Sequence, residues 1–380
     1  MNKKTKILYL TTTSILFGAE KMLYELAARL SEKKYEIAIC VIKDDQNEQL
    51  LYKLRKKGLK TYCLNINSKW KIWKAIKFIK IIKNFKPDIL QSFLFFDNIL
   101  ARIFGKLTRV PVIISGQRNV EARRSKTRNF LDKITLPLID YTVGNSKAGK
   151  EILINREKVP ENKIKVICNG IDFQSLTAAN NFQLSDLIGK TELSPDIFIL
   201  GFIGRLTKQK GLNYLLEAIS RLKNIILIII GEGRERKNLE KSARKLGVAD
   251  IVYFTGRKEN AWQCMRLFDV LILPSLWEGM PNVLLEAMGQ NISVIATRVG
   301  GIPEIVEDNK TGFLVEPRNS QALAKKISYV LSLPGEEKIK IKENARKKIE
   351  NSFSIEKVVK EYEEFYQNIL QKTDGKHFKT

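Results

Sequence analysis

Short apolar runs rich in β-branched residues alternate with segments of helical periodicity along most of the chain. This alternation is typical of parallel sheets covered by helices, because a strand buried on both faces carries a nearly continuous apolar run. It predicts strands at residues 6–10, 35–42, 61–66, 88–93, 111–116, 141–144 and 164–168. After a polar stretch at 174–195 the alternation resumes and predicts strands at residues 198–204, 225–231, 251–254, 270–274, 293–297 and 312–315.

Two such series indicate an α/β protein with two doubly wound domains. The length of 380 residues agrees with this, since a single hydrophobic core rarely serves more than about 250–300 residues. We expect the first domain at 1–175 and the second at 190–350. A last helix near 354–372 has an apolar face that needs a surface to cover. This face consists of Val358, Val359, Tyr362, Phe365, Tyr366 and Ile369.

The segments that follow strands are the first candidates for a site, because ligands of doubly wound sheets bind at the carboxyl ends of the strands. Residues 201–211 end one predicted strand and open a helix. Gly204 allows close approach of the backbone, and Arg205 and Lys210 add positive charge beside a helix amino terminus. This combination favours a bound diphosphate, with a merely solvated basic turn as the alternative.

Residues 274–288 form the second candidate segment. Glu278 and Glu286 are separated by seven residues, and an apolar helix begins near Pro281. A ribose is a suitable partner for Glu286, because a carboxylate accepts hydrogen bonds from both hydroxyls. The alternatives are that Glu286 faces solvent and that Glu278 only favours the helix dipole. The glycine turns at 231–233 and 300–304 also follow strands, and an ordinary tight turn is the alternative for each.

In order and spacing these segments resemble family 4 of the retaining nucleotide-sugar glycosyltransferases, which contain the "glycosyl transferases group 1" domain and have the GT-B fold. The resemblance is dense over 198–330 and weaker before it. The motifs that carry it are Gly204-Arg205 with Lys210-Gly211, Gly231-Glu232-Gly233, Asp269 to Ser275, Glu278-x7-Glu286, Gly300-Gly301-Ile302-Pro303-Glu304, Phe17-Gly18-Ala19-Glu20, Val143-Gly144-Asn145-Ser146 and Asn169-Gly170-Ile171-Asp172. It implies two facing Rossmann-like domains, with the last helix returning to the first domain.

The resemblance also implies roles for individual residues of this chain. Arg205 and Lys210 would neutralise the diphosphate of the donor, Glu286 would hold the ribose, and Glu278 would touch the transferred sugar. Gly18 would approach the donor phosphate from the first domain. The remaining donor contacts would come from Gly204, Gly256, Arg257, Gly279, Met280, Pro281, Asn282 and Val283. The implied reaction is transfer with retention from a nucleotide-diphosphate sugar, with UDP favoured and GDP possible.

The chain departs from the family at one catalytic position. Many members place a histidine of the first domain near the donor sugar, whereas the single histidine of this chain is His377, close to its end. The equivalent stretch contains Gln117 and Arg118, and either side chain is a candidate for the sugar contact or for acceptor binding. No Asp-x-Asp metal signature occurs, so we expect no metal and no other cofactor, with Arg205 and Lys210 taking the place of a divalent ion.

Positive charge is concentrated in the first half of the chain. The formal net charge is +25, and residues 1–180 hold 35 Lys or Arg against 16 Asp or Glu. A helical segment at 68–83 is expected to bury Ile72, Ala75, Ile76, Ile79 and Ile82 and to present Trp70, Trp73, Lys74, Lys77 and Lys80 on its other side. With Arg123 and Arg124, this surface favours peripheral docking on an anionic membrane and a lipid-linked or glycan acceptor. The alternatives are buried tryptophans and a merely solvated lysine-rich face.

Other features restrict the class of protein. No run of about 18 apolar residues occurs, and the four cysteines are scattered without a C-x-x-C pair, so we expect a reduced, cytoplasmic protein at the inner face of the plasma membrane. The charge also suits a nucleic-acid-binding protein, but no zinc spacing, helix-turn-helix pattern or RNA-binding strand motif supports one. Another GT-B enzyme, such as a sugar phosphorylase or a nucleotide-sugar epimerase, remains the closer alternative.

Overall fold

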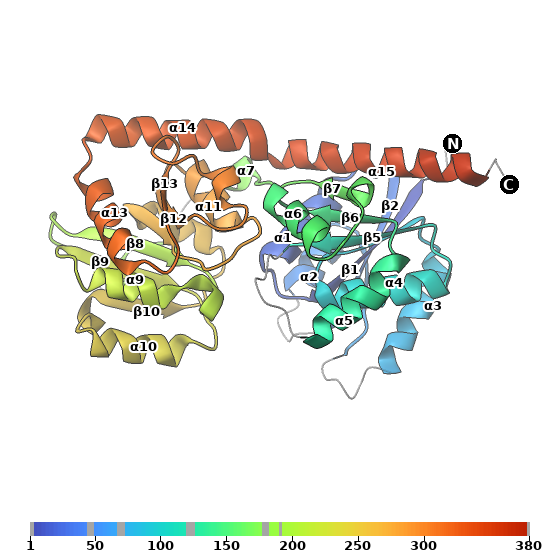
Figure 1. Ribbon diagram of the computed structural model, residues 1–380, viewed down its shortest axis with the longest axis horizontal. Helices are drawn as coiled ribbons and strands as arrows, with labels where there is room; N and C mark the ends of the chain where they lie inside the picture. Colours follow the sequence, from blue (N-terminus) through green and yellow to red (C-terminus); the bar gives the residue numbers. More distant parts are fainter. Residues whose placement is uncertain are drawn as a thin grey trace. The chain divides into compact units, whose positions relative to one another are not determined.

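The computed structural model describes residues 4–43, 49–66, 73–118, 126–176, 182–189 and 192–377, without the side chains of 373–377. The chain forms two compact units (Figure 1). Unit 1 comprises Met1–Asn169 and Ile355–Thr380, and unit 2 comprises Gly170–Ser354. Each unit contains one parallel sheet with covering helices, which confirms the predicted α/β class.

The sheet of unit 1 has seven strands in the order β3-β2-β1-β4-β5-β6-β7. These are β1 Thr5–Thr13, β2 Tyr35–Lys43, β3 Lys60–Cys63, β4 Ile89–Ser92, β5 Val112–Gln117, β6 Tyr141–Gly144 and β7 Ile164–Val166. The helices of unit 1 are α1 Gly18–Arg29, α2 Gln49–Lys56, α3 Ile76–Phe85, α4 Phe95–Leu107, α5 Lys126–Thr135, η2 Leu136–Leu138, α6 Lys147–Asn155, η3 Glu161–Lys163 and α15 Ile355–His377. The threonines after residue 10 extend β1 beyond its predicted end, because Thr11 and Thr13 still pair with β2.

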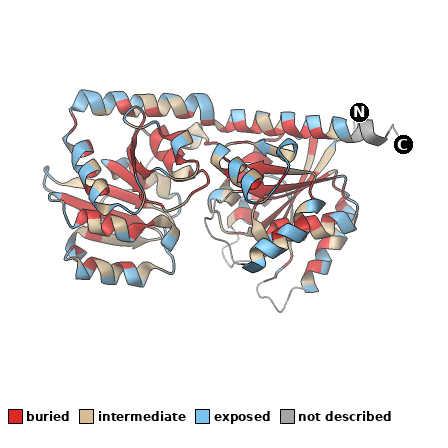
Figure 2. Ribbon diagram, in the orientation of Figure 1, coloured by how far each residue is buried: buried red, intermediate tan, exposed pale blue. Residues whose placement is uncertain are grey.

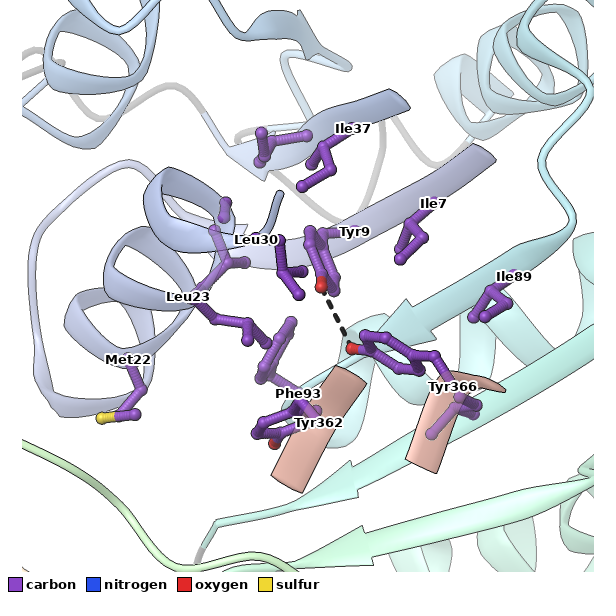
Figure 3. Packing of buried hydrophobic residues seen from close by; sticks show 14 of the residues in the cluster. Ile7, Tyr9, Met22, Leu23, Leu30, Ile37, Ile89, Phe93, Tyr362 and Tyr366 are labelled. Carbon is purple, nitrogen blue, oxygen red and sulfur yellow. Dashed lines mark hydrogen bonds between the residues drawn. The ribbon is translucent and has the colours of Figure 1, made fainter. Parts of the chain in front are cut away.

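Two apolar clusters cover the two faces of this sheet. One is built by residues of β1, β2, β4, β5, β6, α1, α2 and α15, and its largest fully buried members are Tyr9, Tyr362 and Tyr366 (Figure 3). The hydroxyls of Tyr9 and Tyr366 lie 3.0 Å apart, and Tyr366 donates a hydrogen bond of 2.7 Å to Gln91. The predicted return of the last helix to the first sheet is therefore confirmed, and burial of the tyrosine rings is what holds it there.

The second cluster joins the other face of the sheet to α3 and α4. Ala75, Phe78, Ile82 and Phe85 of the α3 region are buried, at a spacing that keeps one helical stripe against the sheet. The prediction that Ile76 is part of this core was wrong: its side chain is 60% exposed, because the rings at positions 78 and 85 set the buried stripe. Ile79 is half-buried, and Ile72 lies outside the described residues.

The sheet of unit 2 has six strands in the order β10-β9-β8-β11-β12-β13. These are β8 Phe198–Ile203, β9 Ile225–Ile230, β10 Val252–Gly256, β11 Val270–Leu273, β12 Ser293–Thr297 and β13 Phe313–Val315. The helices of unit 2 are α7 Phe173–Leu176, α8 Ser185–Ile188, η4 Lys208–Lys210, α9 Leu212–Ile219, α10 Arg236–Lys245, η5 Ala249–Ile251, η6 Ala261–Leu267, α11 Asn282–Gly289, α12 Ile302–Ile305, α13 Ser320–Ser332 and α14 Gly335–Phe353. Figure 2 shows that the strands are mostly buried while the helices expose one side.

Candidate active site

The candidate donor site lies in unit 2, where the segments after β8, β11 and β12 meet. Gly211 and Gly300 have left-handed backbone, with φ of 62° and 52°. A Cβ atom on Gly211 would lie 2.1 Å from the carbonyl oxygen of Pro274, and one on Gly300 would lie 1.8 Å from that of Glu278. Each glycine therefore allows its backbone to lie directly against the segment 274–278, Gly211 beside Pro274 and Gly300 beside Glu278.

Glu278 is the centre of this arrangement. Its side chain is almost fully buried, and its Oε1 atom lies 2.5 Å from Nζ of Lys210, whose side chain is also largely buried. Ser275 donates a hydrogen bond of 2.7 Å to the same oxygen, and Gln209 approaches Oε2 at 3.4 Å. The two residues for which the resemblance implies sugar and diphosphate contacts are thus paired with each other.

Helix α11 begins beside this pair. Asn282 and Val283 are its first residues, and Gly279, Met280 and Pro281 lead into it. The carbonyl of Gly279 accepts a hydrogen bond of 2.9 Å from the amide of Gly301, which fixes the entry to the helix. The amino end of a helix attracts negative charge, so this segment suits a phosphate or an oxygen-rich sugar.

Glu286 lies on α11 and is only 9% exposed. The alternative that it faces solvent is therefore excluded. A carboxylate at so buried a position requires polar partners, which agrees with a role in holding hydroxyl groups.

Gly204 and Arg205 follow β8, Gly256 is the last residue of β10, and Arg257 follows it. Arg205 and Arg257 are exposed, and the amide of Gly204 donates a hydrogen bond of 3.0 Å to the carbonyl of Ile230. These four residues thus lie at the carboxyl ends of two strands of one sheet, on either side of β9.

Sequence reasoning did not identify Arg236, Gln209 or Ser275. Arg236 pairs with Glu232 and Glu240 and donates a hydrogen bond of 3.1 Å to the carbonyl of Phe254. Its hydrogen bond with Glu240 is the main reason why its pKa is raised. It therefore anchors the turn at 231–233 to β10. Ser275 lies three residues before Glu278 in a turn, and this spacing could have indicated the hydrogen bond between their side chains.

In unit 1, Gly18 is the first residue of α1 and is exposed. The preceding segment is held by Asp97, which accepts hydrogen bonds from the hydroxyl of Thr12 at 3.1 Å and from the amides of Phe93 and Leu94 at 2.9 Å. Burial raises the pKa of Asp97 to about 7, against the opposing effect of these hydrogen bonds. Asp97 thereby joins the end of β1 to the start of α4.

Arg118 directly follows β5, and two of its three guanidinium nitrogens have partners within unit 1, whereas its buried Nε has none among the described residues. It donates hydrogen bonds to Asn169 at 2.6 Å and to the hydroxyl of Tyr362 at 2.8 Å, and its guanidinium lies 5.4 Å from the ring centre of Phe93. This geometry gives Arg118 a structural part in joining β5 to α15.

Its neighbour Gln117 donates to Glu157 at 3.4 Å. Among the described groups, Oε1 of Gln117 and Oδ1 of Asn145 are buried acceptors without a partner. Both residues lie at the carboxyl ends of their strands, where a ligand hydroxyl would satisfy them.

The predicted membrane residues are only partly described. Trp73 is 62% exposed, so the alternative that it is buried is wrong for this residue. Lys77 and Lys80 are exposed and Lys74 is half-buried. Trp70, Arg123 and Arg124 lie outside the described residues. All four cysteines are free; Cys40 and Cys264 are buried as expected, whereas Cys63 and Cys168 are half-buried.

Comparison with known proteins identifies the family. Residues 18–175 match the family model described as Glycosyltransferase Family 4, and residues 185–348 match the one described as Glycosyl transferases group 1. The chain belongs to glycosyltransferase family 4. As a glycosyltransferase of GT-B fold, it has the two Rossmann-like units that the resemblance implied.

Two relatives and one solved structure illustrate the similarity. The chain is 27% identical to the capsular polysaccharide biosynthesis glycosyltransferase CapM of Staphylococcus aureus, covering 79% of this chain and 82% of the relative. It is 26% identical to UDP-Gal:alpha-D-GlcNAc-diphosphoundecaprenol alpha-1,3-galactosyltransferase of Escherichia coli, covering 96% and 97%. A glycosyltransferase structure from Rickettsia africae ESF-5 superposes with a TM-score of 0.80 at 25% identity, covering 97% of this chain and 99% of the other.

Two further features of the described part of this glycosyltransferase concern membranes and metal ions. No helix there combines the length and the apolar character that crossing a membrane requires. In the same residues, no group of three or more His, Cys, Asp or Glu side chains is placed to hold a metal ion.

Proposed function

We propose that this glycosyltransferase moves a sugar, with retention, from a UDP-sugar to a lipid-linked acceptor carried on a polyprenyl diphosphate, in the synthesis of a cell-surface polysaccharide or glycolipid. The names of the relatives from Staphylococcus aureus and Escherichia coli support the pathway, the UDP donor and the acceptor class. The observation that carries the proposal is the buried Lys210–Glu278 pair at the carboxyl ends of the strands of unit 2.

The reaction requires positive charge beside the leaving diphosphate, and Lys210 of this pair carries such a charge. In transfer, the bond between the anomeric carbon and the diphosphate oxygen breaks, the acceptor oxygen bonds to that carbon, and the proton of the acceptor hydroxyl passes to an oxygen of the departing diphosphate. Negative charge grows on the departing nucleoside diphosphate, so fixed cations contribute most of the stabilisation. We assign this task to Lys210 and Arg205, without a metal ion.

Glu278 has a different task from Lys210 and Arg205 in this scheme, because it contacts the transferred sugar. Its carboxylate accepts a hydrogen bond of 2.5 Å from the ammonium of Lys210. An incoming diphosphate competes for the same ammonium group, because phosphate oxygens are equally strong acceptors. The carboxylate oxygen released in this exchange is then available to accept a hydrogen bond from a hydroxyl of the transferred sugar. Glu286 holds the ribose from α11.

An assay of nucleotide release tests the proposed reaction. The purified protein is incubated with UDP-galactose, UDP-glucose, UDP-N-acetylgalactosamine or GDP-mannose, with and without a synthetic polyprenyl-diphosphate-linked N-acetylglucosamine. We expect UDP to be released only when the acceptor is present, with a product one sugar heavier by mass spectrometry. Sugar phosphate formed with inorganic phosphate would instead indicate a phosphorylase, and an isomerised UDP-sugar without acceptor would indicate an epimerase.

The exposed apolar residues of unit 1 support docking at a membrane. Six of the nine large apolar side chains that the described residues expose belong to α3, α4, α5 and the turn before α3. They are Trp73, Ile76, Phe96, Leu107, Phe130 and Ile134. Helix α4 contacts both α3 and α5, so these helices form one layer, which we call the α3–α5 layer (Figure 1). Apolar side chains between lysines suit the interface of an anionic bilayer.

Salt should therefore weaken membrane binding. Attraction of about 1 kcal/mol per basic residue fades as the Debye length shrinks from about 10 Å at 0.1 M salt. We expect the triple variant Lys74→Glu/Lys77→Glu/Lys80→Glu to lose sedimentation with anionic vesicles at low salt while it keeps UDP binding. Lys237→Glu/Lys241→Glu/Lys245→Glu on α10, three exposed lysines of unit 2, is the matched control. Equal sedimentation of both variants and wild type would show that α3 does not contact lipid.

A further inference from the structure

A pocket of about 650 Å³ lies in unit 1, outside the residues assigned to transfer. One wall is formed by α5 and η2, and the other by residues 156–163, which connect α6 to β7. These connections enter β6 and β7 at their amino ends, whereas Gln117 and Asn145 lie at the carboxyl ends of β5 and β6. The pocket therefore opens at the amino ends of these strands, and Glu157 of its lining accepts a hydrogen bond of 3.4 Å from Gln117 of the candidate transfer site.

The floor of the pocket is apolar. Leu136, Ile139 and Val159 line it and belong to a small cluster that also includes Leu153 and Ile164. Because this floor offers no hydrogen bonds from side chains, a small hydrated ion would gain little from entering it. A ligand with a short apolar portion fits the floor better.

The rim of the pocket carries surplus positive charge. Its basic residues are Lys133, Arg156, Lys158 and Lys163. Its two acidic residues are already engaged, since Asp132 pairs with the buried Arg102 at 2.8 Å and Glu157 pairs with Arg156 at 3.3 Å. Lys163 donates a hydrogen bond of 2.9 Å to the carbonyl of Ile139, so Lys133 and Lys158 are the rim lysines best placed to hold an anion.

The neighbouring surface of α5 is apolar. Phe130 is 62% exposed and Ile134 is 52% exposed, and they lie one helical turn apart. Phe130 also lies one turn before the pocket residue Lys133, and Ile134 is next to it in sequence, so the apolar pair borders the basic rim. A site for a soluble anion does not need two exposed apolar side chains beside it, whereas a site at a membrane surface does.

We propose that this pocket binds the headgroup of an anionic phospholipid, with the phosphodiester held by Lys133 and Lys158 and with Phe130 and Ile134 inserted among the adjoining acyl chains. The inference rests on the proposed function, because a lipid-linked acceptor requires the enzyme at a bilayer. Since α5 is part of the α3–α5 layer, a headgroup in this pocket would fix how that layer meets the membrane. The site is separate from the contact made by α3.

Vesicle flotation tests this proposal. Vesicles of phosphatidylcholine with about 30% phosphatidylglycerol, containing no acceptor, are mixed with wild type, Lys133→Ala/Lys158→Ala, Phe130→Ser/Ile134→Ser, and the control Lys237→Ala/Lys241→Ala, which removes the same charge from α10. We expect partitioning to fall at least about tenfold in the first two variants and to change less than about twofold in the control. UDP affinity, measured by calorimetry, should be the same in all four proteins.

The other outcomes are equally decisive. Equal partitioning of Lys133→Ala/Lys158→Ala and the control overturns the proposal. So does calorimetric binding of soluble glycerol phosphate to wild type together with unchanged partitioning of Phe130→Ser/Ile134→Ser, which would indicate a site for free phosphate esters. Because no donor or acceptor is present in the vesicles, failure here leaves the transferase assay unaffected, and failure of that assay leaves this result intact.

Discussion

Replacement of Lys210 by alanine is expected to lower turnover by about two to three orders of magnitude, because it removes a fixed cation from the charge that develops on the leaving diphosphate. The same change leaves Glu278 buried without its cation, and Ser275 and Gln209 are then its side-chain hydrogen-bond partners among the described residues. A loss of stability is therefore expected as well, and thermal unfolding must be measured beside steady-state kinetics.

Two further variants separate these effects. Arg205→Ala should reduce turnover by a similar factor, because Arg205 is the other cation assigned to the leaving diphosphate. Since its side chain is exposed, we expect a smaller loss of stability than for the largely buried Lys210. Lys208→Ala is the matched control, an exposed lysine two residues before Lys210. Turnover near that of wild type in both Lys210→Ala and Arg205→Ala would mean that the diphosphate is bound elsewhere.

Glu278→Gln and Glu286→Gln are expected to have opposite effects on nucleotide binding. Glu278→Gln removes the carboxylate that competes with the diphosphate for Lys210, so UDP should bind at least as tightly as to wild type. Turnover should nevertheless fall by about two orders of magnitude, because the amide is a poorer acceptor for the sugar hydroxyl. Glu286→Gln should weaken UDP binding by about tenfold, since a hydrogen bond to a charged group contributes about 1.5–3 kcal/mol.

Calorimetric titration with UDP and steady-state kinetics measure both effects. Glu337→Gln, an exposed position at the start of α14, controls for the loss of one negative charge. If Glu278→Gln and Glu286→Gln lose UDP affinity equally, the assignment of sugar to one carboxylate and ribose to the other is wrong.

The sheet of each unit could be predicted because its central strands are buried on both faces. Runs such as Ile225–Ile230 have no polar position. An apolar run of that length between turn signals predicts a central strand of a parallel sheet. Helix faces were harder to assign. In α3 both Ile76 and Phe78 are apolar, and only the packing against β1 and α4 decides which of them is buried.

The candidate site was predictable in its residue types but not in its internal contacts. Lys210 and Glu278 are 68 positions apart, and they meet only because β8 and β11 are neighbours in the sheet. The order of parallel strands depends on how crossover helices pack, which local patterns do not contain. Sequence alone therefore assigned the two residues to two different groups of the donor, and their pairing became visible only in the folded chain.

The division of unit 1 into two stretches of sequence has a consequence for how the protein is made. Unit 2 is a continuous stretch inserted into unit 1, and the tyrosines that complete the first core are on α15. During translation, domains generally fold as their sequence emerges from the ribosome. Here the core of the amino-terminal sheet cannot be completed until unit 2 and the last helix have been synthesised. Until then Tyr9 and Gln91 lack their partner Tyr366. Nascent chains that stop before α15 should therefore be recognised by chaperones as incomplete, even though unit 2 has already folded.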